Sequence, residues 1–310
     1  MLIAVTGGTG FVGRHVVAAL RQDGHTVRAM ARRDAPELAA LGATLIQGAL
    51  DGGDGIERLV DGADAVVHVA GVIQAPDRDT FEAINAGGSA RVAAAMAARP
   101  GRMLLQVSSV AAREPAVSDY AASKLHGEQL ALTHADRLDV MVVRPPAVYG
   151  PGDRSTLPIF KGLSRGWLLH PAGAAARFSL IFASELADLV VALLAHPVRS
   201  GTIVEPDDGT PGGYGWAGLA SIAQQRIGRR VRAIGLPKLP LTIAAGLAER
   251  YAARRGRTPV LAQGKIEEFY HRDWVCDTSG LAAVSSWRPR IRFDDGLPPT
   301  LAWYRAAGWL

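Results

Sequence analysis

The chain opens on a short apolar run that leads directly into a cluster of glycines. Residues 2–7 read as a buried strand, and residues 11–24 read as an amphipathic helix. Glycines between a strand and a helix allow a tight turn, let the backbone approach a phosphate, and place the helix N-terminus against its charge. The segment therefore predicts a dinucleotide pyrophosphate site at Gly7, Gly8, Thr9, Gly10, Phe11, Val12 and Gly13.

Short β-rich apolar runs alternate with helical stretches through the first half of the chain, from LIAVTG to MLLQVSS. This alternation predicts an α/β fold with a Rossmann-type doubly wound parallel sheet. We expect residues 1–150 to form the nucleotide-binding domain and to carry the catalytic residues. Residues 151–310 should form mainly a smaller C-terminal substrate-binding lobe, from which a part, about 180–206, returns to the Rossmann core.

Composition and the terminal sequence set limits on location and metal binding. Of the 310 residues, 48% are hydrophobic and 20% are charged, which is typical of a globular protein. The chain starts without a basic leader or an apolar signal core, so we expect a cytoplasmic protein. The single Cys276 and eight histidines without ligand spacing predict neither a disulfide nor a metal site.

Basic residues are concentrated between Arg226 and Arg257, where nine of them stand against one acidic residue. Apolar residues, and not aromatic stacking residues, are interleaved with them, so no nucleic acid is expected as a partner. Peripheral contact with an anionic membrane suits this composition better. A solvated helix face is the alternative interpretation.

The end of the second strand decides between the two nicotinamide cofactors. An acidic side chain there binds the ribose 2′-hydroxyl of NAD. Ala31 occupies that position, and Arg32 and Arg33 follow, which suits a 2′-phosphate. We therefore favour NADP(H). NAD(H) stays open as the alternative, because a one-residue change of register would bring Asp34 to the ribose.

Tyr120 and Lys124 lie four residues apart, hence one turn apart on one face of a helix. Reduction of a ketone needs a proton donor near the carbonyl oxygen, and a tyrosine beside a cation can supply that proton. Ser109, at the end of the run MLLQVSS, is placed to hydrogen-bond the same oxygen. The three residues predict an oxidoreductase.

These motifs together resemble the extended short-chain dehydrogenase/reductases, also described as the NAD-dependent epimerase/dehydratase family. The resemblance runs from TGGTGFVG through HVAG, VSSVAA, YAASK and RPPAVYGPGD to DTSGLAAVSSWRP. It implies that Ser109, Tyr120 and Lys124 form the catalytic triad. It also implies that Asn85 assists a proton relay, although Asn85 could equally cap the helix that follows.

The same resemblance implies further contacts and an assembly. A homodimer packed through helices near residues 86–98 and 120–133 is common for this fold. Besides the glycine turn and the arginines, we expect the cofactor to contact Leu50, Val69, Ala70, Gly71, Val107, Tyr120, Lys124, Pro145 and Val148.

Three features bear on the substrate. Ala147 stands where many nucleotide-sugar enzymes carry an asparagine, and Tyr120 follows Ser109 at a short interval. Arg177 is retained where an arginine often binds pyrophosphate. The candidate substrate contacts are Ser109, Ala147 and Arg177. We expect a bulky, lipid-like ketone or secondary alcohol, such as a sterol or an oxidised ceramide, closest in character to the substrates of 3β-hydroxysteroid dehydrogenases or ceramide reductases. A nucleotide-sugar epimerase or dehydratase is the alternative, and a non-catalytic cofactor-binding subunit is a third interpretation.

Overall fold

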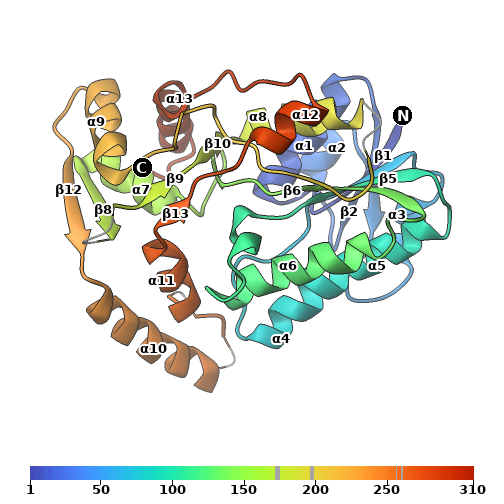
Figure 1. Ribbon diagram of the computed structural model, residues 1–310, viewed down its shortest axis with the longest axis horizontal. Helices are drawn as coiled ribbons and strands as arrows, with labels where there is room; N and C mark the ends of the chain where they lie inside the picture. The colour runs from blue at the N-terminus through green and yellow to red at the C-terminus, as the bar shows by residue number, and fades with distance from the viewer. Residues whose placement is uncertain (172–174, 196–198, 256, 260) are drawn as a thin grey trace. The chain divides into compact units, whose positions relative to one another are not determined.

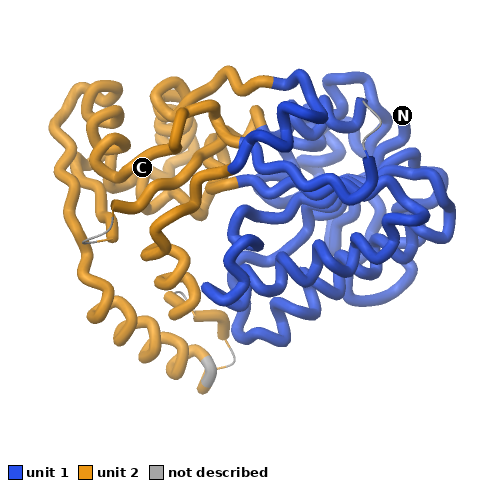
Figure 2. The backbone as a smooth tube through the Cα atoms, in the orientation of Figure 1, with its two compact units in different colours: residues 1–145, 186–206, 277–287 blue, residues 146–185, 207–276, 288–310 orange. Residues whose placement is uncertain are grey.

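The computed structural model describes two compact units (Figure 2), each with its own core. Unit 1 consists of Met1–Pro145, Leu186–Pro206 and Asp277–Trp287, and unit 2 of Pro146–Glu185, Asp207–Cys276 and Arg288–Leu310. The sequence placed the boundary near residue 150 and one return near 180–206, and it left residues 277–287, the second return, in the C-terminal lobe. The described residues are 1–171, 175–195, 199–255, 257–259 and 261–310.

Unit 1 follows a strand–helix alternation (Figure 1). Its strands are β1 (Leu2–Thr6), β2 (Thr26–Ala31), β3 (Thr44–Gln47), β4 (Ala65–His68), β5 (Arg102–Val107), β6 (Leu138–Val143) and β11 (Thr202–Val204). Its helices are α1 (Phe11–Gln22), α2 (Pro36–Ala40), α3 (Gly55–Val60), α4 (Arg78–Phe81), the π-helical η1 (Glu82–Ala86), α5 (Gly87–Ala97), the 3₁₀ turn η2 (Val110–Arg113), α6 (Asp119–Leu132), most of α8 (Ala183–Leu194) and α12 (Ser279–Val284).

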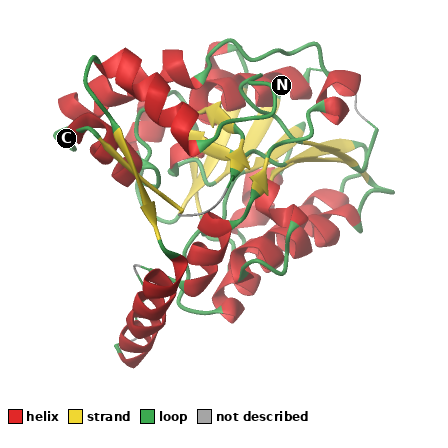
Figure 3. Cartoon of the chain, turned by 60° about the vertical axis from the view of Figure 1, so that its left-hand side comes forward, coloured by secondary structure: helices red, strands yellow, loops and turns green. Residues whose placement is uncertain are grey.

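The seven strands of unit 1 form one parallel sheet in the order β11-β6-β5-β4-β1-β2-β3. The inner strands β1 and β4 are buried along almost their whole length, as expected for a sheet covered on both faces. In Figure 1, α1 and α2 lie on one side of these strands and α5 and α6 on the other, and Figure 3 shows helices on both faces. The predicted Rossmann-type doubly wound fold is confirmed.

Strand order reverses between β1 and β4, which is the point where such sheets bind ligands beyond the carboxyl ends of their strands. Helix α3 packs on β1, β2 and β3, and helix α5 packs on β5, with Leu59, Val92, Met96 and Leu104 almost wholly buried. This packing fixes the strand ends that carry the candidate site.

Unit 2 is organised around aromatic side chains, with Tyr149, Phe160, Phe293 and Tyr304 buried in one cluster. Its strands pair two by two: β7 with β10, β8 with β12, and β9 with β13. Its elements are β7 (Ala147–Tyr149), α7 (Leu157–Arg165), β8 (Trp167–Pro171), β9 (Arg177–Phe178), β10 (Leu180–Phe182), α9 (Trp216–Ile227), β12 (Arg232–Leu236), α10 (Lys238–Arg254), α11 (Gln263–Tyr270), β13 (Asp273–Trp274) and α13 (Phe293–Ala306).

Among the described residues, no helix combines the length and the apolar character that crossing a bilayer requires.

Candidate active site

The turn between β1 and α1 takes a form that requires glycine at two positions. Gly7 has a φ of 72°, and a Cβ there would lie 2.6 Å from the backbone nitrogen of Ala70. A Cβ at Gly13 would lie 2.0 Å from the carbonyl oxygen of Gly7. The Gly10 amide closes the turn by donating to that same oxygen at 2.9 Å. The turn therefore lies against the end of β4, and α1 packs directly upon it.

The N-terminus of α1 is open to an anion. Gly10 occupies the N-cap position, no side chain caps the helix, and the first turn contains no acidic residue. Thr9 and Gly10 are exposed, Phe11 and Val12 are half-buried, and Gly8 is buried beneath them. First-turn N–H groups and the helix dipole favour a phosphate at such a position. The turn fits the pyrophosphate of a dinucleotide.

The end of β2 carries cationic side chains. The strand ends at the buried Ala31, and Arg32, Arg33 and Asp34 follow, all three exposed. Within the part of the chain that the structure describes, neither arginine makes an ion pair or a side-chain hydrogen bond. Both guanidinium groups are therefore available to a ligand.

Helix α6 carries Tyr120 and Lys124 one turn apart. Tyr120 is half-buried, and its ring centroid lies 6.2 Å from that of Phe81. Lys124 is buried, and its Nζ donates a hydrogen bond of 2.9 Å to the carbonyl oxygen of Val107, the last residue of β5. This bond ties the ammonium group to the strand end that continues into Ser109.

A carboxylate that the sequence analysis missed lies behind Lys124. Glu128 is 1% exposed, accepts a hydrogen bond from the Ser108 hydroxyl, and accepts one of 2.9 Å from Arg144 Nε. Burial lowers the pKa of Lys124 to about 8, and the negative charge of Glu128 opposes that shift. The four-residue spacing from Lys124 to Glu128 was the signal available in the sequence.

His68, the last residue of β4, is a neutral neighbour of Lys124. Its Nδ1 lies 2.7 Å from the hydroxyl oxygen of Thr6, which also accepts from the Ala70 amide at 3.2 Å. Burial, and secondly the positive charge of Lys124, lower the pKa of His68 to about 3. The imidazole therefore adds no second positive charge beside the ammonium at neutral pH.

Asn85 holds two segments together and does not cap a helix. It lies in η1, inside the continuous helix that runs from α4 into α5, so the capping alternative is wrong. Its Oδ1 accepts from the Val72 amide at 2.8 Å, and its Nδ2 donates to the Val72 carbonyl at 3.0 Å. Nδ2 also donates to the Ser123 hydroxyl at 3.0 Å. The side chain thus joins the loop after β4 to helix α6.

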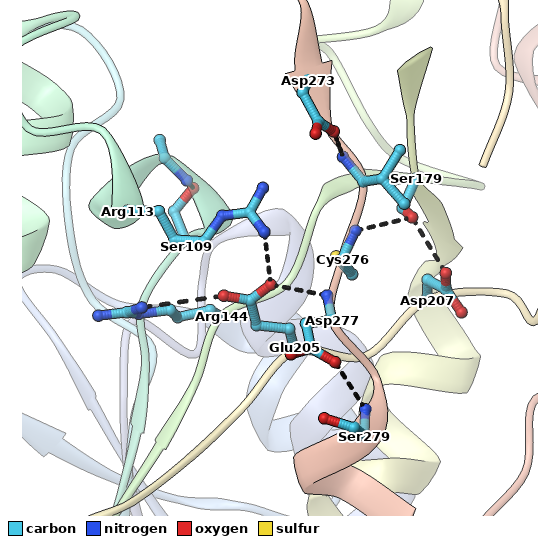
Figure 4. A network of polar contacts seen from close by, with 12 residues as sticks. Ser109, Arg113, Arg144, Ser179, Glu205, Asp207, Asp273, Cys276, Asp277 and Ser279 are labelled. Carbon is cyan, nitrogen blue, oxygen red and sulfur yellow. Dashed lines mark hydrogen bonds and ion pairs between the residues drawn. The ribbon is translucent and has the colours of Figure 1, made fainter. Parts of the chain in front are cut away.

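Ser109 follows the end of β5 and begins η2, with its hydroxyl oxygen accepting from the Ala111 amide at 3.2 Å. The side chain is half-buried. Arg113 fixes the position of η2, because its guanidinium donates a hydrogen bond of 3.1 Å to the Glu205 carboxylate (Figure 4). The backbone that carries Ser109 is therefore anchored to the end of β11.

The remaining predicted cofactor contacts fall on both units. In unit 1, Gly71 converges with two other site residues, because a Cβ there would lie 3.0 Å from Asn85 Oδ1 and 3.8 Å from Lys124 Nζ. Leu50 packs against the helix position of Gly88. Val69, Ala70 and Val107 lie at the ends of β4 and β5, Pro145 ends the first segment of unit 1, and Val148 lies in β7 of unit 2.

The two other predicted substrate contacts belong to unit 2. Ala147 is exposed at the start of β7. Arg177 is exposed in β9, and its Nε and one terminal nitrogen each donate at 2.9 Å to carbonyl oxygens of Gly212 and Gly213. Two of its N–H groups are thus used on the loop before α9, so the guanidinium has fewer donors left for a pyrophosphate.

Comparison with known sequences agrees with the family resemblance. Residues 3–205 match the NAD dependent epimerase/dehydratase family. The chain is 38% identical, over all of its length and 96% of the relative, to a ceramide reductase of Caulobacter vibrioides. It is 32% identical to a 2-alkyl-3-oxoalkanoate reductase of Stenotrophomonas maltophilia, a match that covers 51% of this chain and 54% of the relative.

Comparison with solved structures agrees with the fold. A UDP-glucuronic acid 4-epimerase from Bacillus cereus, solved with UDP-glucuronic acid and NAD, superposes with a TM-score of 0.76 over 99% of this chain and all of that one. The two sequences are 16% identical, so this likeness concerns the fold alone.

Proposed function

Because this chain belongs to the NAD dependent epimerase/dehydratase family and is an oxidoreductase of the extended short-chain dehydrogenase/reductase type, we propose that it reduces a ketone on a bulky lipid, with NADPH as the hydride donor. An oxidised ceramide is the favoured substrate. The observation that carries this proposal is the full-length resemblance to a ceramide reductase, combined with the Tyr120–Lys124 pair on α6.

The chain's own groups divide the proton chemistry between them. NADPH, when bound, supplies the hydride that reaches the carbonyl carbon. The Tyr120 hydroxyl donates a proton to the carbonyl oxygen, and the Ser109 hydroxyl hydrogen-bonds the same oxygen. The Lys124 ammonium, held on Val107, stabilises the tyrosinate that remains, and it would hydrogen-bond the nicotinamide ribose of a bound cofactor. Asn85 fixes the loop after β4 against α6 and so supports the proton relay.

Residues of the β1–α1 turn and of the segment after β2 would hold the cofactor. The open helix N-terminus at Gly10 suits the pyrophosphate, and Arg32 and Arg33 suit a 2′-phosphate through charge-assisted hydrogen bonds. The absence of an acidic side chain at Ala31 supports NADP(H) over NAD(H).

The test measures oxidation of NADPH and of NADH by the purified protein with an oxidised ceramide in detergent. We expect turnover with NADPH, at least about ten-fold slower turnover with NADH, and loss of about 10³-fold in Tyr120→Phe with NADPH affinity retained, because the variant lacks only the proton donor. Turnover retained in Tyr120→Phe would contradict the assignment. Conversion of a UDP-sugar by protein that retains tightly bound NAD would favour the epimerase alternative instead.

A further inference from the structure

Helix α10 presents an apolar stripe to solvent. Leu239, Ile243, Leu247 and Tyr251 follow one another at four-residue intervals, and they are 58–70% exposed. Four-residue spacing places them along one face of a helix. The opposite face packs on unit 2 through Ala245, which is fully buried, so the stripe faces away from the core of its own unit. Figure 1 shows α10 between β12 and α11 along the chain.

The same exposed face is cationic. Arg250 and Arg254 flank the C-terminal end of the stripe, and the Arg255 guanidinium lies 4.8 Å from the centroid of the Tyr251 ring. Within the described residues, neither Arg250 nor Arg254 has an ion pair or a side-chain hydrogen bond.

The acidic groups near α10 are already engaged. Glu267 of α11 accepts from Lys238 at 2.6 Å, and Glu268 accepts from Lys265 at 2.8 Å. Glu249, on α10 itself, accepts from the backbone of Gln263 at 2.7 Å. The excess positive charge therefore lies with the arginines at the end of the stripe.

We propose that the exposed face of α10, defined by Leu239, Ile243, Leu247, Tyr251, Arg250 and Arg254, docks this protein on an anionic lipid surface. An apolar stripe beside unpaired cations is the pattern of a helix that lies in the plane of a membrane interface, with the arginines at the headgroups. A parallel pairing with a second copy of the chain would bring the same arginines face to face, so the charge disfavours that arrangement. The inference rests on the proposed function, since a lipid ketone resides in such a surface.

The test is sedimentation of the full-length protein with vesicles of phosphatidylcholine, with and without about one-third phosphatidylglycerol. We expect binding only to the anionic vesicles, and weaker binding as the salt concentration rises because the charges are screened. Ile243→Glu/Leu247→Glu should weaken this binding by at least about ten-fold, because it removes the apolar insertion. Arg250→Gln/Arg254→Gln should weaken it by about 25-fold, at about five-fold for each charge.

Arg137→Gln/Arg305→Gln is the matched control, because it removes the same net charge from exposed arginines outside α10. It should bind within about two-fold of the unaltered protein. Each variant is first checked for a native circular dichroism spectrum and for turnover of the ketone in detergent.

The proposal is overturned if the unaltered protein does not sediment with anionic vesicles, or if the Ile243→Glu/Leu247→Glu protein sediments as well as the parent. Dissociation of an oligomer by this variant, without vesicle binding by the parent, would instead assign the face to a second copy. Failure of the proposed function gives a different result, which is no ketone turnover in detergent while vesicle binding persists.

Discussion

At the scale of single residues, the candidate site depends on the groups that surround one buried ammonium group, that of Lys124. Lys124 is held by the Val107 carbonyl, faces an uncharged His68, and is balanced by Glu128 one turn away. The sequence predicts Lys124 because its spacing from Tyr120 is local. The effects of Glu128 and His68 on the Lys124 ammonium depend on the burial of all three side chains. That burial is produced by the whole sheet and cannot be read from a single sequence.

The pH dependence of turnover should report this ammonium. Since the Lys124 pKa is lowered to about 8, the group is charged below that pH and neutral above it. We therefore expect kcat/KM for ketone reduction to fall as pH rises through about 8, because the tyrosinate loses its cation. Lys124→Arg keeps its positive charge throughout this pH range. The variant should be less active than the parent, but its activity should persist to higher pH. An unchanged alkaline limb in this variant would exclude Lys124 as the titrating group.

At the scale of elements, local signals predict β1, the glycine turn, α1 and α6, because each has its own spacing. Asn85 shows where this fails. Sequence reasoning left it between a relay and a helix cap, whereas the π-helical η1 continues α4 into α5 and directs the side chain at Val72 and Ser123. The basic stretch around α10 was evident, but only the fold shows which of its faces is buried.

The contact between the glycine turn and α1 gives a prediction at this scale. A Cβ at Gly13 would lie 2.0 Å from the Gly7 carbonyl, so Gly13→Ala must displace the helix from the turn. We expect NADPH affinity, measured by nicotinamide fluorescence, to fall by at least about 100-fold because the first-turn N–H groups move. Gly218→Ala is the control, since a Cβ there meets nothing within 4 Å. Equal affinity of the two variants would refute the close packing.

At the scale of the whole molecule, unit 1 is assembled from three separate stretches of chain, and Glu205 joins all three. Its carboxylate accepts from Arg113 at 3.1 Å and from the Asp277 amide at 3.0 Å, and it lies 3.8 Å from Arg144 (Figure 4). Neither return to unit 1 carries Ser109, Tyr120 or Lys124. The second return, at 277–287, falls on the motif DTSGLAAVSSWRP, which sequence reasoning left in the C-terminal lobe because no strand pattern in it indicates a return to the sheet.

Glu205→Gln tests whether this junction stabilises the protein. The side chain is 9% exposed, so loss of its charge leaves the Arg113 guanidinium with a weaker acceptor in a poorly hydrated place. We expect the free energy of unfolding to fall by about 2 kcal/mol, seen as a melting temperature lower by several degrees. Glu37→Gln, at an exposed position on α2, should melt like the parent. Because Glu205 anchors the turn that begins at Ser109, the Glu205→Gln protein should also turn over ketone more slowly while binding NADPH normally. A lower melting temperature with unchanged turnover would limit Glu205 to a structural role.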